Sequence, residues 1–209
     1  MSDLEVTRRS LHGVAELLLA GPQHARSGTI RLRVTPAGFG TVAEPELRVE
    51  GTRLVHPGGL VELDGRTPVD VAEEAGIAAT SLVDVYSDGH EVLATDVLRV
   101  HAGSAAVLSS AFEIGDAAMR VLAPDETPVL WPEHFDVGIS VDEVNYGVSP
   151  GDTYCATPYA YVGPWALRRG DFWTAPFGAV RPWGELGGLD DVVAFFTEGR
   201  ERAAHDPPA

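Results

Sequence analysis

The sequence predicts an α+β fold: a mixed, mainly antiparallel sheet packed by about four helices, with long aromatic Gly/Pro-rich loops in the C-terminal part. Three observations predict it. Several long segments repeat apolar residues with the 3.6-residue period of an amphipathic helix. Short alternating segments lie between them, separated by turn residues that suit hairpins. Thirteen of the 16 aromatic residues lie between residues 131 and 196, among many glycines and prolines.

The N-terminal part alternates helical and extended patterns. Its main signals are three: apolar residues at the spacing of one helix face, a segment that alternates apolar and polar residues as a half-exposed strand does, and a Thr-Pro pair typical of a helix start. In chain order we expect a helix over 4–20 that ends at Gly21-Pro22, a strand over 29–34, a hairpin of 47–49 and 53–55, a helix that follows Thr67-Pro68 and closes at Gly76, and a strand over 82–86 that ends at Asp88-Gly89. Thr67 is expected to cap its helix, because a threonine hydroxyl accepts from backbone N–H groups at that position.

The C-terminal part starts from the clearest amphipathic pattern of the chain. In chain order we expect a helix over 104–122, strands over 137–141, 144–148 and 159–162, ordered loops over 163–187 and a helix over 189–202. A short Pro-containing break separates residues up to 124 from those after 128, and five residues is a connection length. The sequence therefore predicts one two-lobed domain over 1–205, with lobes of about 1–124 and 128–205, followed by a disordered tail over 206–209.

Composition limits the classes of partner. The 209 residues carry a net charge of −16, with 15 arginines and no lysine. Such a surface repels nucleic acid and anionic membranes, so we expect neither as a partner. The N-terminus lacks a long apolar stretch, which favours a cytoplasmic protein. Cys155 is the single cysteine, so no disulfide forms within the chain. The pattern carries no signal for an oligomeric state.

The sharpest chemical feature is Glu133, His134 and Asp136, three groups able to move protons or bind metal within four residues. In a strand that begins near His134, the side chains of His134 and Asp136 would point to one face, because the side-chain period is two. With a third ligand they could hold a divalent metal, the one cofactor the sequence suggests. As a pair they could act as general base and orienter. The structural alternative is a hydrogen-bond network that joins loops.

Two further segments contain residues that could bind or react. His12 lies with Glu16 at i+4 on the first helix, off the main apolar stripe. It is a second candidate, against the alternative of a surface or boundary histidine. The turn Ser149-Pro150-Gly151-Asp152 lacks the glycine count and the lysine of a phosphate loop, so a tight turn is favoured.

Aromatic residues downstream of the His134 segment predict a ligand pocket lined by residues 131–183. Stacking and edge hydroxyls would hold a sugar or another flat organic molecule. The candidate ligand-binding residues are Trp131, Tyr146, Asp152, Tyr159, Tyr161, Trp165, Trp173 and Arg168. The alternative is that the rings are core and loop anchors. Tyr159 and Tyr161 share one face of their strand, because the side-chain period is two, and Ala160 and Val162 share the other, so one of these two faces is the buried one. Arg168, beside Arg169, could clamp an anionic group or lie in solvent.

The chain resembles a largely actinobacterial domain family of unknown function. The resemblance is carried by Leu11-His12, by Ile30-Arg31-Leu32 with Thr35-Pro36, by Trp131-Pro132-Glu133-His134-Phe135-Asp136, by Tyr146 to Asp152, by Pro158 to Val162 and by the closing helix over 191–201. It is tight from about 128 to 203, and family members often have a longer, more aromatic N-terminal half. The resemblance implies one architecture centred on the His-Phe-Asp segment and implies no activity.

Two functions follow as expectations. The first is a small-molecule binding protein or enzyme, with metal-assisted or acid–base hydrolytic chemistry at the His134 segment. The second is a non-enzymatic protein–protein interaction module that uses exposed Trp and Tyr loops, since aromatic residues often dominate interface energetics.

Overall fold

The computed structural model describes residues 1–86, 89 and 92–208, and it confirms an α+β fold. Two runs of strands lie between groups of helices along the chain, and every described strand pairing is antiparallel. The chain divides into two compact units, Met1–Ser110 with Leu130–Phe135, and Ala111–Val129 with Asp136–Ala209. The expected lobes met near 124–128, whereas the segment Leu130–Phe135 belongs to the first unit. No helix in the described part of the chain is long and apolar enough to cross a membrane.

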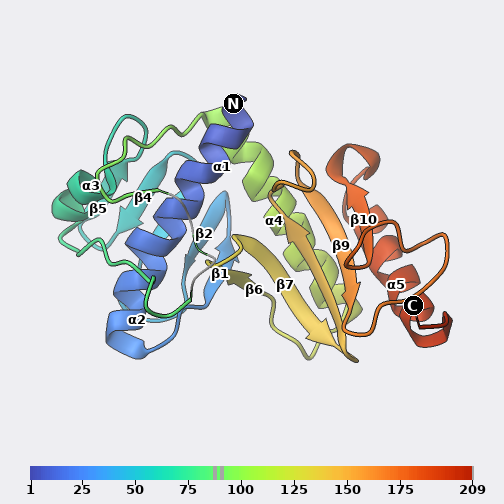
Figure 1. The fold of residues 1–209 in the computed structure, drawn as a ribbon. Helices are drawn as coiled ribbons and strands as arrows, with labels where there is room; N and C mark the ends of the chain where they lie inside the picture. Colours follow the sequence, from blue (N-terminus) through green and yellow to red (C-terminus); the bar gives the residue numbers. More distant parts are fainter. Residues whose placement is uncertain (87–88, 90–91, 209) are drawn as a thin grey trace. The chain divides into compact units, whose positions relative to one another are not determined.

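The first unit contains an antiparallel sheet built mostly from short hairpins (Figure 1). Its strands are β1 (Leu32–Thr35), β2 (Gly38–Thr41), β3 (Arg48–Glu50), β4 (Arg53–His56), β5 (Gly59–Glu62) and β6 (Val129–Trp131), in the order β6-β1-β2-β3-β4-β5. The predicted hairpin is confirmed as β3 and β4, with Val49 opposite Leu54. The strand predicted over 29–34 begins later, because the Gln23 side chain donates to the backbone carbonyls of Thr29 and Arg31.

The N-terminal helix does not end at Gly21-Pro22, so that prediction is wrong. It runs as α1 (Asp3–Val14), a π-helical turn η1 (Ala15–Ala20) and α2 (Gly21–Ser27). A proline inside a regular α-helix clashes with the carbonyl four residues earlier. The wider π turn changes the register just before Pro22: the Gly21 N–H bonds to Glu16 O, and Leu17 O accepts from the Thr80 N–H at 2.9 Å. The helix therefore continues to Gly28, whose φ of 74° ends it.

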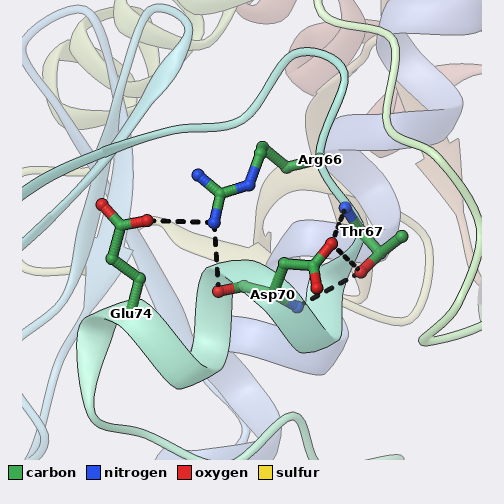
Figure 2. A network of polar contacts seen from close by, with 4 residues as sticks. All are labelled: Arg66, Thr67, Asp70 and Glu74. Carbon is green, nitrogen blue, oxygen red and sulfur yellow. Dashed lines mark hydrogen bonds and ion pairs between the residues drawn. The ribbon is translucent and has the colours of Figure 1, made fainter.

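Helix α3 (Pro68–Ala75) starts where the sequence predicts, and Thr67 is its cap. The Thr67 hydroxyl accepts from the Asp70 N–H at 3.2 Å, and the Asp70 carboxylate accepts from the Thr67 N–H at 3.3 Å (Figure 2). The Asp70 carboxylate also lies 2.7 Å from the Thr67 hydroxyl, and the hydrogen bonds it accepts from the Thr67 hydroxyl and then from the Thr67 N–H lower the pKa of Asp70. Arg66 also binds the Glu74 carboxylate at 2.9 Å. The reciprocal capping arrangement satisfies N–H groups that the first helical turn leaves unpaired.

The strand predicted over 82–86 is wrong. Leu82 is buried, but Val83 and Val85 are exposed, and the Leu82 carbonyl accepts from the N–H groups of Val85 and Tyr86. These local bonds make a turn, since a strand needs a neighbouring strand to pair its backbone. Asp88, expected to end the strand, lies outside the described residues.

Helix α4 (Ala102–Leu122) begins in the first unit and ends in the second, and it confirms the predicted helix over 104–122. The second unit adds α5 (Leu189–His205), the short helix η2 (Trp183–Glu185) and strands β7 (Asp136–Val141), β8 (Val144–Ser149), β9 (Tyr159–Pro164) and β10 (Ala179–Pro182), in the order β7-β8-β9-β10. The turn between β7 and β8 places Asp142 and Glu143 at positive φ, as a two-residue hairpin requires.

The sheet of the second unit has two different faces, set by strand register. One face, which we call the helix face, carries Val137, Ile139, Tyr146, Val148, Ala160 and Val162. Helices α4 and α5 pack on it, with Gly115 against Val148 and Gly199 against Val162 (Figure 1). The opposite face, which we call the polar face, carries Asp136, Gly138, Ser140, Asn145, Gly147, Ser149, Tyr159, Tyr161 and Gly163. The sequence left open which face of β9 is turned to the helices, and the Gly199–Val162 contact decides it.

The C-terminal part contains more regular secondary structure than expected, and its last described residues are ordered. The stretch 163–187 contains β10 and η2 in addition to loops. Residues 206–208 are not a disordered tail: Asp206 accepts a hydrogen bond from the Trp173 indole at 2.9 Å, and Pro207 O accepts from the Arg169 N–H at 2.9 Å. Terminal residues are ordered when such bonds tie them to the body of the protein. Ala209 lies outside the described residues.

Candidate functional site

The His134 segment forms a turn, so the predicted strand geometry is wrong. Residues 132–135 connect β6 to β7, and Phe135 adopts a φ of 53°. The Phe135 ring is buried and meets Phe39 edge-on at 5.3 Å. Burying this ring holds the turn, and His134 beside it is exposed. Among residues 1–86, 89 and 92–208, no three His, Cys, Asp or Glu side chains gather as a metal site requires.

His12, the second candidate, lies in the last turn of α1 and contacts the same turn of residues 132–135. Its Nε2 is 2.7 Å from Pro132 O and 3.2 Å from Glu16 Oε1, and its ring stacks on Phe135 at 5.4 Å. A backbone carbonyl only accepts hydrogen bonds, so Nε2 carries a proton and donates. The stack and this bond together fix the orientation of the imidazole.

Glu16 makes this contact from a buried position. Its side chain is only 4% exposed, and it belongs to the π-helical turn η1. Burial first, and then the nearby Glu16 carboxylate, raises the pKa of Tyr86 well above its usual value, with Glu133 adding a smaller contribution. A side chain at Gly89 would meet the Glu16 oxygens at 2.7 Å, so the backbone lies close over this carboxylate. An imidazole held by a buried carboxylate is the arrangement of a general base with its orienter.

In the second unit, Asp136 and Tyr161 form the first of two tyrosine–aspartate pairs. The Tyr161 hydroxyl donates to Asp136 Oδ2 at 2.5 Å. Its ring lies across Gly138 and Gly147 of the neighbouring strands, where a Cβ atom on Gly147 would collide with the phenol. The two glycines thus make room for the ring on the polar face.

The second pair is Tyr159 and Asp152. The Tyr159 hydroxyl donates to Asp152 Oδ2 at 2.6 Å. The other oxygen, Oδ1, accepts from the backbone N–H groups of Tyr154 at 2.8 Å and Cys155 at 3.0 Å. Asp152 therefore closes the turn that follows it, over residues 152–155, and also holds a tyrosine of β9.

Four rings form a continuous series, which we call the aromatic row: Phe177, Tyr154, Tyr159 and Tyr161. Successive ring centroids are 5.3, 6.3 and 6.4 Å apart. Tyr154 is 48% exposed and Phe177 38%, whereas Tyr159 is buried. The row therefore runs from the surface into the polar face of the sheet, with a carboxylate bonded to each of its two inner rings.

The two inner tyrosines keep their protons. Burial is the main cause that raises the pKa of Tyr161 well above its ordinary value, and the Asp136 carboxylate adds to it. Burial likewise raises the pKa of Tyr159, and its hydrogen bond to Asp152 follows in importance. Both phenols are hydrogen-bond donors near neutral pH, and neither supplies a base.

Other predicted ligand residues lie elsewhere. Tyr146 is on the helix face, fully buried, with its ring edge-on to Phe196 at 5.8 Å. Trp131 belongs to the first unit, where the Arg31 guanidinium lies 5.6 Å from its ring centroid. Both positions favour the alternative that these rings are anchors of the fold.

The loop candidates divide in the same way. The Trp173 indole is bonded to Asp206, and Arg168 donates to the carbonyls of Ala203 and Ala166 at 2.9 and 2.8 Å. These bonds favour structural roles for both. Trp165 is 66% exposed, and its indole donates to Asn145 on the polar face at 3.2 Å.

The structure thus brings together Asp136, Tyr161, Tyr159 and Asp152, four of the predicted site residues. The sequence analysis did not select Phe177 or Tyr86. Phe177 carried a signal, because it lies in the aromatic Gly/Pro-rich stretch 163–187. Tyr86 carried none, since its neighbour Glu16 is 70 positions away in the chain.

Comparison of the chain with protein-family models, with curated proteins and with solved structures finds no match. The family resemblance drawn from the sequence stays a prediction.

Proposed function

We propose that the second unit binds a small organic molecule at the aromatic row. The observation that carries the proposal is the exposure of the outer rings of the row: Tyr154 and Phe177 are 48% and 38% exposed, whereas Tyr159 behind them is buried and Tyr161 is half-buried. A ring series that served only as core would be enclosed throughout. Exposed rings that continue into an ordered polar face suit a flat or compact ligand.

Hydrogen bonds support the proposal by holding the row in place before a ligand arrives. Asp152 binds the Tyr159 hydroxyl and the backbone at Tyr154 with the two oxygens of one carboxylate. The outermost tyrosine is therefore attached through Asp152 to the sheet. A preordered site loses less conformational entropy on binding, which increases affinity.

The proposal is one of binding and assigns no reaction to the row, because the two inner phenols keep their protons. The acid–base chemistry expected of the His134 segment has better geometric support at His12 and Glu16, where an imidazole nitrogen lies 3.2 Å from an oxygen of a buried carboxylate. His12 is the residue whose replacement would test an enzymatic role.

A ligand-observed NMR screen tests the binding proposal. The probes are a mixture of sugars, aromatic acids and amines, each added to the full chain and to the Tyr154→Leu variant. We expect at least one probe to give saturation transfer with the native chain and to lose it in the variant. Leu167→Ala, which removes another exposed apolar side chain, is the matched control and should leave the signal unchanged. Equal signals in all three proteins would refute binding at the row.

Exposure of Trp165 favours a second candidate, the protein–protein interaction module. Trp165 and Leu167 are 66% and 46% exposed, and an exposed tryptophan is typical of an interface hot spot. In this function Trp165→Ala would abolish capture of a partner protein and leave small-molecule binding intact. Light scattering on the native chain and on Trp165→Ala would separate self-association from partner binding.

A further inference from the structure

We infer that the ligand of the aromatic row is an organic cation, an amine or a quaternary ammonium group. This inference rests on the function proposed above and specifies the chemical class of its ligand. It is carried by the combination of two features in one place: exposed aromatic faces, and carboxylates bonded to the same row.

The charged residues at the strand positions of the polar face and in its adjoining turn are acidic. Asp136 is at the start of β7, and Asp152 binds the Tyr159 side chain from the adjoining turn. The strand positions that share this face hold no arginine, and the chain has no lysine. Arg181 of β10 pairs with Ala160, a helix-face position, and its guanidinium lies 5.1 Å from the Phe195 ring centroid. An anionic ligand would therefore meet repulsion and find no ionic partner on this face.

The rings provide the second half of the recognition. Aromatic faces attract cations through the negative charge of the ring face, and the attraction is strongest for weakly hydrated organic cations. Tyr154 and Phe177 meet edge-on at 71°, so their faces point in different directions and can border a single rounded group from two sides. Asp152 is exposed beside Tyr154, and its carboxylate adds a charge of opposite sign to the ligand.

Hydrogen bonding excludes the simplest alternative, a ligand held mainly by donors of the protein. Both inner phenols already direct their protons to carboxylates, and those carboxylates only accept. The row thus presents acceptors and ring faces. A neutral sugar could stack on the rings, but it would gain nothing from the negative charge.

Three probes of one shape test the inference: choline, its neutral carbon isostere dimethylbutanol, and the anion dimethylbutyrate. Affinity is measured by ligand-observed NMR titration on the full chain. We expect choline to bind roughly tenfold more tightly than dimethylbutanol, and dimethylbutyrate more weakly still, as a charge-dependent cation–π contact requires. In Asp152→Asn, which keeps an oxygen for the backbone N–H groups, the preference for choline should fall several-fold. Glu201→Gln, a surface charge change on α5, should leave it unchanged.

The outcomes separate this inference from the proposed function. Equal or tighter binding of dimethylbutanol, lost in Tyr154→Leu, would overturn the cation while leaving the row as a binding site. If none of the three probes binds at millimolar concentration, the inference that the ligand is a cation is also refuted. The ligand screen described above would then test by itself whether the aromatic row binds a small molecule. A choline preference that survives Asp152→Asn but disappears in Glu201→Gln would place the cation elsewhere and refute the inference.

Discussion

Replacing Tyr146 by phenylalanine should stabilise this protein. The Tyr146 ring is fully buried on the helix face, and its hydroxyl has no hydrogen-bond partner within the described part of the chain. Asp142 and Arg200 lie close enough to affect the pKa of Tyr146, but they pair with each other at 2.7 Å. The hydroxyl therefore loses its hydration on folding and recovers no bond.

The magnitude follows from the cost of an unpaired polar group. Leaving a buried donor or acceptor unsatisfied costs about 1–3 kcal/mol. Tyr146→Phe removes that group and preserves the edge-on contact with Phe196, so we expect a gain of about 1 kcal/mol. In a protein of this size such a gain raises Tm by roughly 2–4 °C.

Tyr159→Phe is the matched variant, because it removes the same atom from the same sheet. The Tyr159 hydroxyl donates to Asp152 at 2.6 Å, and a hydrogen bond to a charged group contributes about 1.5–3 kcal/mol. This variant should therefore lose stability by about 2 kcal/mol, with a sign opposite to that of Tyr146→Phe.

Urea unfolding at neutral pH measures both changes, followed by circular dichroism and by intrinsic fluorescence. Since the chain forms two units, the two probes are compared first, and the transition that responds to the second unit is used if they differ. Destabilisation by Tyr146→Phe of more than about 1 kcal/mol would show that the hydroxyl is satisfied and would refute the reasoning.

Three other outcomes are expected. Burial raises the pKa of Tyr146 to about 12 against an ordinary 10, so the folded state holds its phenol proton more tightly than the unfolded state does. The contribution of this group to the free energy of unfolding should be complete below about pH 10 and should fall as the pH rises toward 12. Urea titrations across alkaline pH should show a smaller fall in Tyr146→Phe than in the native chain. Gly199→Ala should destabilise the protein by about 1–3 kcal/mol despite the better helix propensity of alanine, because its Cβ would meet Val162 at 2.7 Å. Gly103→Ala, at a helix position with open space around it, should stabilise the protein by up to about 1 kcal/mol. Thermal melts that rank the two variants the other way would contradict the packing of α5. His12→Phe should keep the stack on Phe135 but lose both Nε2 contacts, at a cost of about 2 kcal/mol by urea unfolding, and an unchanged midpoint would mean that the contact with Glu16 contributes nothing.

Sequence patterns correctly predicted those elements that are stabilised by contacts between residues close together in the chain. The capped start of α3 depends on Thr67 and Asp70, which are three residues apart, and the hairpin turn of β7 and β8 depends on two adjacent residues. The same local reasoning failed at Pro22, where a π-helical turn accommodates the ring. It also failed at residues 82–86, where a β-like composition has no neighbouring strand to pair with.

The candidate site also combines features that the sequence predicted with contacts between residues distant in the chain. Alternation in β9 placed Tyr159 and Tyr161 on one face, and the structure confirms that placement. The contacts of the aromatic row come from distant segments. Asp136, which binds the Tyr161 hydroxyl, is 25 positions from Tyr161 in the chain, and Phe177, whose ring contacts Tyr154, is 23 positions from Tyr154. The predicted pairing of His134 with Asp136 failed because the buried Phe135 ring bends the chain into a turn between them.

The order of amino acids by itself determined the class of fold, most of its helices, the hairpin of β3 and β4, three strands of the C-terminal sheet and the concentration of rings in the C-terminal part, because periodicity and turn chemistry act between neighbours in the chain. Only the tertiary structure decided which face of the C-terminal sheet the helices cover, and which histidine meets a buried carboxylate. Those outcomes depend on contacts between distant residues, such as Gly199 with Val162 and His12 with the Pro132 carbonyl. Close packing selects such contacts from many that the same local patterns would permit.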